Sequence, residues 1–323
     1  MPGRVRLILL IGALLAVAAA LWVAVPWYVS GPLGKDTAFI VPDGSSLGSV
    51  AQKLEKEGAI GSAQGFRLRA RLFGGGAPIK AGEFLLPKGA SPAKVLATIQ
   101  GDEVLRRFVT VPEGMPSIMV YERLMAQPYL TGPIPVPPEG SILPDSYDFQ
   151  RGETRQAVLL RMQAAMRRAI EEAWTRRKPA SVVKTREEAV TLASIVEKET
   201  GKPAERRMVA GLYSNRLRQG IMLQADPTII YPITKGKPLG RRIRQSEILA
   251  VNGYNTYSMV GLPQGPITNP GKASLLAVLD PAPTDALYMV ADGTGGHAFA
   301  ATLQQHNDNV AKWFAIRRAR GEM

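Results

Sequence analysis

The longest apolar run of the chain lies at its N-terminus. Leu7 to Val25 contains no charged residue, and about 19 residues of helix extend roughly 28 Å, enough to cross the hydrocarbon core of a bilayer. Arg4 and Arg6 precede this run, and aromatic residues of the kind that gather at membrane interfaces lie at its other end: Trp22, Trp27 and Tyr28. The pattern predicts a cytoplasmic tip at residues 1–6, a transmembrane anchor at 7–25 and a large domain outside the membrane.

A cleaved signal peptide is the alternative interpretation of this segment. Ala18-Ala19-Ala20 resembles a cleavage site of small residues, but the apolar run continues past it to Pro26. An uncleaved, single-pass anchor is therefore the favoured prediction. Glycine and proline then become frequent, and residues 26–37 are expected to form a linker.

A short pattern occurs three times after the linker. A β-type run ends in Pro-x-Gly, which suits a turn, and a small polar residue and an amphipathic segment follow. The runs begin at Phe39, Phe84 and Val109. Residues 38–108 are thus predicted to form small strand–turn–helix modules of a LysM-like, glycan-binding type, although such a pattern is also a common supersecondary element.

The clearest helix signals frame an apolar segment in the middle of the chain. Thr185 and Glu188 have the spacing of a capping box, and Gly201 followed by Pro203 marks the end of the helix. Helices are also expected at 151–178 and 204–219, and a turn-rich region with polar and aromatic residues from Gln224 onward. A final strand is expected at 287–290. The fold class predicted for the whole chain is α+β.

Glu197 lies on the apolar face of this helix, with Val190 and Ala193 at i, i+3 and i+7, whereas Glu199 points roughly 200° away. Desolvation and the negative end of the helix dipole would both favour the protonated form of Glu197. A carboxyl that stays protonated near neutral pH can serve as a general acid. The alternative is a structural ion pair with an arginine.

Composition narrows the chemistry. The chain has no cysteine, which excludes disulfides and thiolate sites, and its two histidines are too few for most zinc sites, so no metal and no cofactor is expected. The net charge of +13 would suggest nucleic acid in a cytosolic protein. Outside the membrane it better suits anionic lipid headgroups or acidic wall polymers, so nucleic acid is not an expected partner.

Several strings, in order along the chain, resemble the MltG (YceG-like) family of membrane-anchored endolytic murein transglycosylases. The matching segments are Glu139–Gly140, Leu143–Tyr147, Leu192–Thr200, Asn215–Leu217, Met222–Thr228, Tyr254–Tyr257, Gly261–Pro263, Ala291–His297 and His306–Asn307. The resemblance implies a YceG-like catalytic domain at 109–323. Departures at Ser141-Ile142, Ala225 and Gln264 concern the lining of a groove.

The resemblance further implies cleavage of the β-1,4 bond after N-acetylmuramic acid in nascent glycan strands, leaving a 1,6-anhydro end, with Glu197 as general acid and then base. One carboxyl suffices for this reaction, because the 6-hydroxyl of the sugar is an intramolecular nucleophile. The expected partners are peptidoglycan strands, the bacterial inner membrane and peptidoglycan synthases of the penicillin-binding type. The catalytic domain is expected on the periplasmic side.

Eight further residues are candidate substrate contacts, and Glu139 is also a candidate second carboxylate: Glu139, Asn215, Gln224, Asp226, Tyr254, Asn255, Tyr257 and His297. For each, a loop hydrogen bond is the alternative role. Two other functions stay open. One is a non-catalytic, membrane-anchored peptidoglycan-binding scaffold. The other is a serine acyltransferase, prompted by the S-x-x-K string Ser181–Lys184, although its companion motifs are absent.

Overall fold

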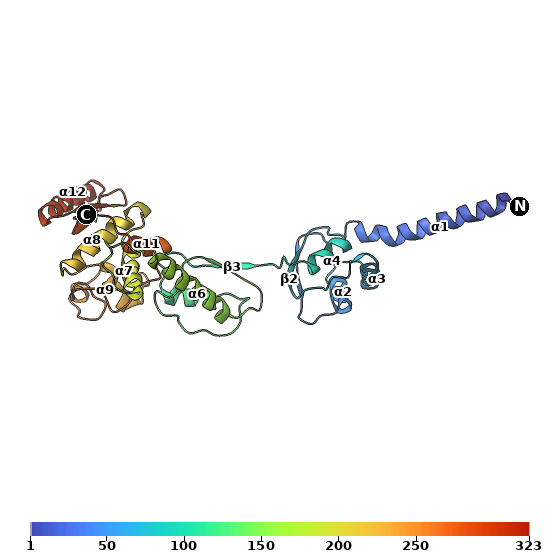
Figure 1. Ribbon diagram of the computed structural model, residues 1–323, viewed down its shortest axis with the longest axis horizontal. Helices are drawn as coiled ribbons and strands as arrows, with labels where there is room; N and C mark the ends of the chain where they lie inside the picture. Colours follow the sequence, from blue (N-terminus) through green and yellow to red (C-terminus); the bar gives the residue numbers. More distant parts are fainter. Residues whose placement is uncertain (1, 323) are drawn as a thin grey trace. The chain divides into compact units, whose positions relative to one another are not determined.

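The structure, a computed structural model, describes residues 2–322, with side chains from Arg6 onward, so the side chain of Arg4 and the start of the expected cytoplasmic tip lie outside it. The chain divides into two compact units (Figure 1). Unit 1 comprises Met1–Arg107 with Gln150–Gly152, and unit 2 comprises Phe108–Phe149 with Glu153–Met323. Each unit has its own apolar core.

Unit 1 begins with the apolar helix α1 (Pro2–Tyr28). Its segment Arg6–Tyr28 is long and apolar enough to cross a membrane, and the most apolar stretch of 18 residues within it is not buried in the protein. The rest of the unit is β1 (Thr37–Val41), α2 (Leu47–Lys56), α3 (Ala63–Phe73), β2 (Gly82–Leu86) and α4 (Pro92–Gln100). Strands β1 and β2 pair antiparallel, from Thr37 opposite Leu86 to Val41 opposite Gly82.

The first two sequence repeats form the predicted strand, turn and helix. Gly44 and Gly89 have φ of 69° and 65° in their turns, a left-handed conformation that favours glycine. Ser46 and Ser91 then cap α2 and α4 by accepting hydrogen bonds from backbone N–H groups three residues on. The strands and helices are thus confirmed, whereas the LysM-like, glycan-binding character of the modules stays a prediction.

The expected linker at residues 26–37 is instead packed into unit 1. Helix α1 continues through Pro26, and Trp27 is only 2% exposed, against Phe66 of α3. Further along, the Gly89 N–H donates to the Leu33 carbonyl at 2.8 Å. The prediction of a linker was wrong because it rested on glycine and proline content, which does not reveal burial of a single tryptophan.

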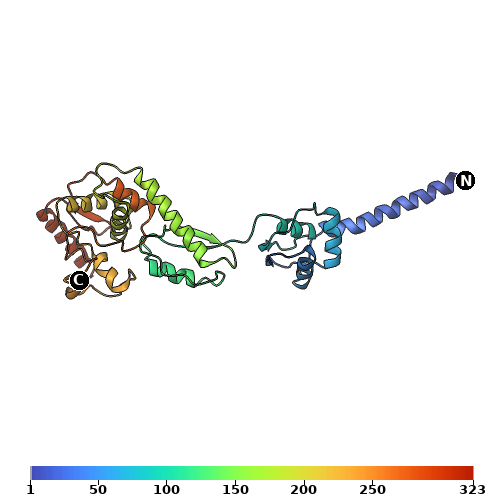
Figure 2. The ribbon, with the colours of Figure 1, turned by 60° about the horizontal axis from the view of Figure 1, so that its bottom comes forward.

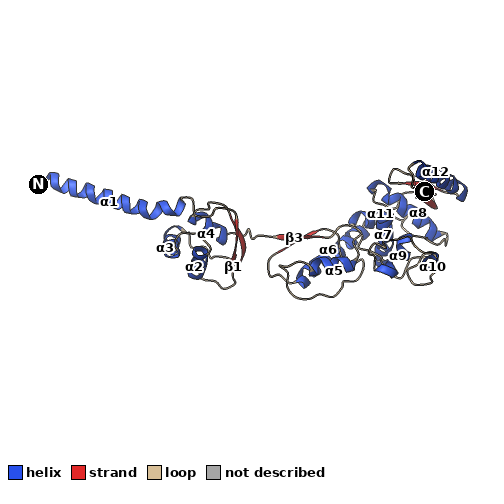
Figure 3. Ribbon diagram, turned by 180° about the vertical axis from the view of Figure 1, so that it is seen from behind, coloured by secondary structure: helices blue, strands red, loops and turns tan. Residues whose placement is uncertain are grey.

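Unit 2 is mainly helical, with two pairs of short strands at its edges (Figure 3). Its first part is β3 (Arg107–Thr110), α5 (Ser117–Met125), β4 (Ser146–Phe149) and α6 (Arg155–Trp174), and β3 pairs with β4. The twenty residues of α6 make the longest helix of this unit, seen in light green in Figure 2. The third sequence repeat therefore contributes β3 and α5 to unit 2.

The remaining elements surround one buried helix, α7 (Arg186–Glu199). They are a 3₁₀ turn at Pro203–Glu205, α8 (Arg206–Arg218), α9 (Asp226–Thr234), α10 (Gln245–Ile248), α11 (Lys272–Leu279), β5 (Tyr288–Ala291), β6 (His297–Ala300) and α12 (Leu303–Ala319). Helix α7 packs against α6, α8, α9 and α11, while β5 and β6 pair antiparallel and contact α12. The mixed α+β class and the N-terminal apolar helix agree with the prediction.

Helices α9 and α11 are among those that were not predicted. Both lie in the region from Gln224 onward that was expected to be turn-rich. Helix α9 has Pro227 in its first turn and Pro232 inside it, and such residues usually signal a turn. Helix α11 has only eight residues, too few to display a clear helical period.

Candidate active site

The last turn of α7 carries three charged residues in succession, Glu197, Lys198 and Glu199, after the buried stretch Ala189–Val196. Residues two positions apart on a helix are separated by roughly 200°. The two glutamates therefore leave the helix on different sides, and Lys198 is exposed between them. Each carboxyl has its own surroundings and its own chemistry.

Glu197 is held by donors from two other helices. Its Oε2 accepts hydrogen bonds from the backbone N–H of Gly271 at 2.9 Å and from the Ser274 hydroxyl at 2.7 Å. Its Oε1 lies 3.4 Å from Nη2 of Arg206 in α8, and the side chain is only 5% exposed. Because Gly271 is the N-cap of α11, the carboxylate also lies at the positive end of that helix dipole.

An amide, a hydroxyl and a guanidinium thus all donate to the Glu197 carboxylate. The prediction from the sequence considered only desolvation and the dipole of α7. The alternative, an ion pair with an arginine, is present as the Arg206 contact, and Arg206 also pairs with Glu113 at 2.8 Å. Glu197 as the catalytic acid stays a prediction, and its surroundings are those of an anchoring group.

Glu199 has the opposite surroundings. Burial, together with the nearby charge of Asp226, raises the pKa of Glu199 to about 7, although a hydrogen bond from the Tyr213 hydroxyl and the charge of Arg216 act against this rise. Its Oε1 is buried and has no hydrogen-bond partner among residues 2–322. A buried acceptor without a partner is rare in folded proteins and often marks a functional group. The sequence analysis did not name Glu199 as a candidate site residue.

Two predicted contact residues lie near Glu199, and a third contacts Arg216. Asp226 is the first residue of α9, and its Oδ1 accepts a hydrogen bond from the Tyr257 hydroxyl at 2.6 Å. Gln224 Oε1 lies 3.4 Å from Nη1 of Arg216. The backbone of Gln224 has φ of 52°, a left-handed conformation that is strained for a residue other than glycine. Such strain is concentrated at functional sites.

The two histidines lie in different networks. The ring of His306 stacks on Tyr288 at 5.2 Å between centroids, and the guanidinium of Arg216 lies 5.5 Å from the centre of the same tyrosine ring. Burial lowers the pKa of His306, and its buried Nδ1 has no hydrogen-bond partner within the described part of the chain. In contrast, Nδ1 of His297 lies 2.8 Å from Oε2 of Glu205, which is a structural contact.

Glu139 belongs to a separate buried network. Its Oε1 accepts a hydrogen bond from the Ser117 N–H at 2.8 Å and lies 3.4 Å from Nδ2 of Asn269, and the Tyr231 hydroxyl also bonds to the carboxyl. Burial raises the pKa of Glu139 to about 7. Tyr254, another predicted contact, joins this network because its ring centre lies 4.7 Å from that of Tyr231.

Two asparagines that were candidate contacts hold backbone instead. Nδ2 of Asn215 donates to carbonyls in segment 284–286 at 2.8 and 3.1 Å. Asn255 is fully buried, and its Nδ2 donates to carbonyls in segment 247–250 while its Oδ1 accepts from the Tyr257 N–H at 3.0 Å. Asn255 therefore positions Tyr257, and neither amide is free to contact a substrate.

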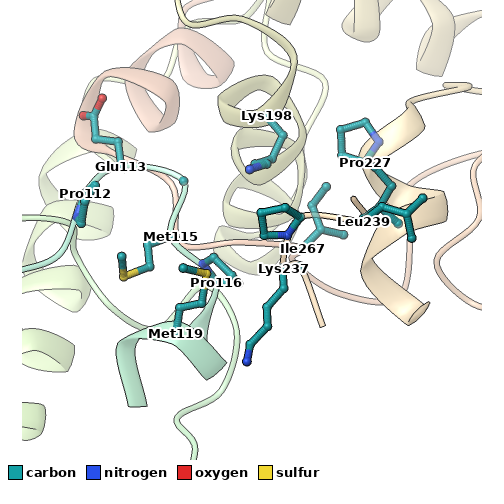
Figure 4. Close-up of a pocket in the computed structure, with 14 residues that line it drawn as sticks. Pro112, Glu113, Met115, Pro116, Met119, Lys198, Pro227, Lys237, Leu239 and Ile267 are labelled. Carbon is teal, nitrogen blue, oxygen red and sulfur yellow. The ribbon is translucent and has the colours of Figure 1, made fainter. Parts of the chain in front are cut away.

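A cavity of about 490 Å³ opens beside the exposed face of the last turn of α7. Figure 4 shows Lys198 between Met115 and Met119 on one side and Pro227 and Leu239 on the other. Its wall is largely apolar, with Lys198, Lys237 and Glu113 as its charged members. A cavity of this size falls in the range of ligand-binding pockets.

Two other chemistries lack support. Ser181 of the S-x-x-K string precedes α7, is buried and donates its hydroxyl to the Val278 carbonyl at 3.0 Å, so it is not placed as a nucleophile. Within residues 2–322, no three histidine, aspartate or glutamate side chains lie together as a possible metal site. The buried carboxyls, Glu139 among them, are the remaining candidates for acid–base chemistry.

The last turn of α7 thus carries two largely buried carboxyls, and Lys198 between them lines the apolar cavity. The chain belongs to the YceG-like family, whose model matches residues 39–312. An endolytic murein transglycosylase of Bacillus subtilis strain 168 is 26% identical over 88% of this chain and 88% of its own length. One from Streptococcus pneumoniae serotype 2 strain D39 is 27% identical over 84% of this chain and 57% of its own length.

A solved structure is also similar. The crystal structure of a YceG-like protein from Listeria monocytogenes at 2.6 Å matches with a TM-score of 0.54 and 25% identity, over 85% of this chain and 98% of that one. The resemblance to the YceG-like family, expected from the sequence, is therefore confirmed.

Proposed function

We propose that this chain is an endolytic lytic transglycosylase of peptidoglycan and that Glu199 is its catalytic acid. Family membership and the names of the relatives support the reaction class. The observation that supports Glu199 is a partly protonated carboxyl, with a pKa raised to about 7, that keeps one buried oxygen without a partner. Glu197, which the sequence predicted as the acid, pairs with Arg206 and accepts a hydrogen bond at the N-terminus of α11.

The reaction needs one carboxyl that gives and then takes a proton. Protonated Glu199 donates its proton to the bridging oxygen of the β-1,4 bond after N-acetylmuramic acid, and the bond from the anomeric carbon to that oxygen breaks. The 6-hydroxyl of the same sugar attacks the anomeric carbon, and its proton passes to the Glu199 carboxylate. The products are a free 4-hydroxyl and a 1,6-anhydro end, so the acid is regenerated and no water is consumed.

Asp226 has two roles in this proposal. Its negative charge raises the pKa of Glu199, so that a useful fraction of the acid is protonated near neutral pH. Fixed by the Tyr257 hydroxyl at 2.6 Å, the same charge stabilises positive charge that develops at the anomeric carbon. A second carboxyl acting on water is not required, because the nucleophile belongs to the substrate.

The location and partners follow from the anchor. Helix α1 holds the enzyme in the bacterial inner membrane with the N-terminus inside and unit 2 in the periplasm, where nascent glycan strands are made. Peptidoglycan synthases are its proposed neighbours, and the strand–turn–helix modules of unit 1 are proposed to contact glycan. Glycan strands are the substrate.

The test is mass spectrometry of peptidoglycan strands incubated with the full chain in non-ionic detergent. The wild type should produce fragments with 1,6-anhydro ends, which are one water lighter than hydrolysed ends, and Glu199→Gln should produce none. Glu197→Gln is the matched control, because it makes the same chemical change two residues away on the same helix.

Three results would contradict the proposal. Reducing ends in place of anhydro ends would mean hydrolysis by activated water. Strand binding by a correctly folded wild type with no new ends would favour the non-catalytic scaffold. An active Glu199→Gln beside an inactive but stable Glu197→Gln would return the acid to Glu197.

A further inference from the structure

Helix α3 packs against the membrane-exit end of α1. The ring centre of Trp27 lies 5.5 Å from that of Phe66 and 6.4 Å from that of Phe73. In addition, Nε of Arg69 donates a hydrogen bond to the carbonyl of Val23 at 2.8 Å. Val23 belongs to the apolar segment that is long enough to cross a membrane. Helix α3 therefore lies next to the C-terminal end of that segment, on the side of unit 1 from which α1 leaves (Figures 1 and 3).

The outer face of α3 is apolar where a soluble protein would have polar residues. Ala63, Phe66 and Ala70 share the buried side. At about 100° per residue, Leu68 and Leu72 lie on the opposite side, and they are 55% and 60% exposed. Their spacing of four residues makes them one stripe.

The apolar stripe continues onto α1. Phe73 is 40% exposed and its ring centre lies 6.3 Å from that of Tyr28, which is 64% exposed and is followed by Val29 at 52%. Exposed apolar surface that is continuous with a candidate membrane span is expected where a protein enters a bilayer rather than water.

Positive charge accompanies this stripe. Arg67 and Arg71 are exposed on α3 beside the two leucines, and the helix contains no acidic residue. Residues 58–82 as a whole contain no aspartate or glutamate. A helix with leucines on one part of its surface and arginines beside them is typical of helices that lie in the headgroup layer of a membrane.

We propose that α3 is an interfacial helix, which lies on the outer surface of the membrane that α1 crosses. Leu68 and Leu72 enter the boundary between headgroups and acyl chains, and Arg67 and Arg71 bind anionic lipid phosphates. The aliphatic parts of the arginines can remain among the lipids while their guanidinium groups reach the phosphates. Unit 1 is then attached at two points, α1 and α3, which fixes its tilt on the membrane.

The absence of cysteine from the chain allows a direct test by spin labelling. A nitroxide is attached to Leu72→Cys in the full chain, reconstituted in vesicles of phosphatidylglycerol and phosphatidylcholine or of phosphatidylcholine alone. The matched control carries the label at Glu103→Cys, which is exposed between α4 and β3. Collisions with oxygen report lipid, and collisions with a water-soluble nickel chelate report water.

The label at position 72 should meet oxygen more often than nickel in the anionic vesicles, and the label at 103 should show the reverse. Arg67→Glu with Arg71→Glu should shift the label at 72 toward nickel, because each arginine near an anionic surface contributes about fivefold to partitioning. Leu68 is the second labelling position if a label at 72 disturbs the helix.

Three outcomes would overturn the proposal. A label at position 72 as accessible to nickel as the label at 103 would place α3 in water. Shielding from both oxygen and nickel would mean that protein, such as a second copy of the chain, covers the stripe. Equal immersion in pure phosphatidylcholine would remove the role assigned to the arginines.

Discussion

The two glutamates of α7 should respond in opposite ways to the same substitution. Glu197 is fully bonded and Glu199 retains a buried acceptor without a partner in the described structure. We therefore expect Glu197→Gln to lower the stability of unit 2 and Glu199→Gln to leave it unchanged or raise it, while Glu199→Gln alone abolishes the chemical step. The contrast separates an anchoring carboxylate from a catalytic one.

The cost of Glu197→Gln follows from its three partners. Removing one member of a buried ion pair costs about 3–5 kcal/mol, and the Glu197 side chain is 5% exposed beside Arg206. Glutamine keeps one carbonyl oxygen, which can still accept from Gly271 or Ser274, so part of the interaction survives. We expect a net loss of about 2–3 kcal/mol, largest at the N-terminus of α11.

The effect of Glu199→Gln follows from its pKa. That pKa rises from 4.5 to about 7, and each pKa unit corresponds to about 1.36 kcal/mol. Ionised Glu199 at pH 7.5 is therefore unfavourable in the folded chain by about 3 kcal/mol relative to the unfolded chain. A neutral glutamine of the same size removes that cost, so stability should rise by about 0–2 kcal/mol after allowance for a weaker bond to Tyr213.

Hydrogen exchange along a urea titration, with the full chain in non-ionic detergent, measures both changes locally. Peptides from α7 and α11 report the substitutions, and peptides from β1 and β2 in unit 1 serve as the internal reference. The count of 1,6-anhydro ends gives activity on the same samples. A stable, inactive Glu197→Gln together with a destabilised, active Glu199→Gln would refute the reasoning.

Three further results are expected. Initial rates between pH 5 and 9 should fall as pH rises through about 7, because Glu199 must carry a proton, and Asp226→Asn should move that fall to lower pH; an unshifted profile would exclude this coupling. The free energy of unfolding of unit 2 should decrease between pH 4.5 and 7, since Glu199 and Glu139 bind protons more tightly when folded; urea titrations at pH 5 and 7.5 would contradict this if stability rose. Gln224→Gly should raise the melting temperature by relieving about 1 kcal/mol of backbone strain, and it should slow turnover through the lost contact with Arg216; a lower melting temperature would show that no strain is stored there.

Local signals predicted the parts of the fold that local interactions determine. The capping box at the start of α7 is an example, because the Thr185 hydroxyl accepts the Glu188 N–H at 3.1 Å, and Gly201 follows the last turn. The same holds for the serine caps in unit 1. Each of these interactions involves residues within four positions of one another, so the sequence displays both partners together.

Helix α11 shows why other parts could not be predicted. Its N-cap, Gly271, has no side chain that could cap the helix. The N–H of Gly271 donates instead to Glu197, which lies 74 residues earlier in the chain. Tertiary contacts of this kind stabilise short helices whose own propensity is weak. Burial of Trp27 likewise depends on Phe66 and Phe73, which no local pattern connects to it.

The site was predicted less well than the fold for a related reason. Of the residues predicted from the sequence, Asp226 and Tyr257 lie near Glu199, and Gln224 contacts Arg216. The sequence favoured Glu197 over Glu199 because an amphipathic helix has one apolar face and one polar face. All residues of Ala189–Val196 are buried, so this stretch of α7 has no solvent side. Which partners each carboxyl meets was decided by α8, α9 and α11.

Glu197 has a function even where Glu199 carries out the chemistry. Glu199 is the last residue of α7, and terminal turns of helices fray unless something holds them. Glu197 anchors this turn, because it accepts a hydrogen bond from Gly271 at the N-terminus of α11 and pairs with Arg206 of α8. Glu197→Gln should therefore slow turnover by loosening the position of Glu199, while the pH at which activity falls stays where the wild type has it. A glutamate that acts on the substrate itself would change that pH, so the pH profile distinguishes a positioning residue from the acid.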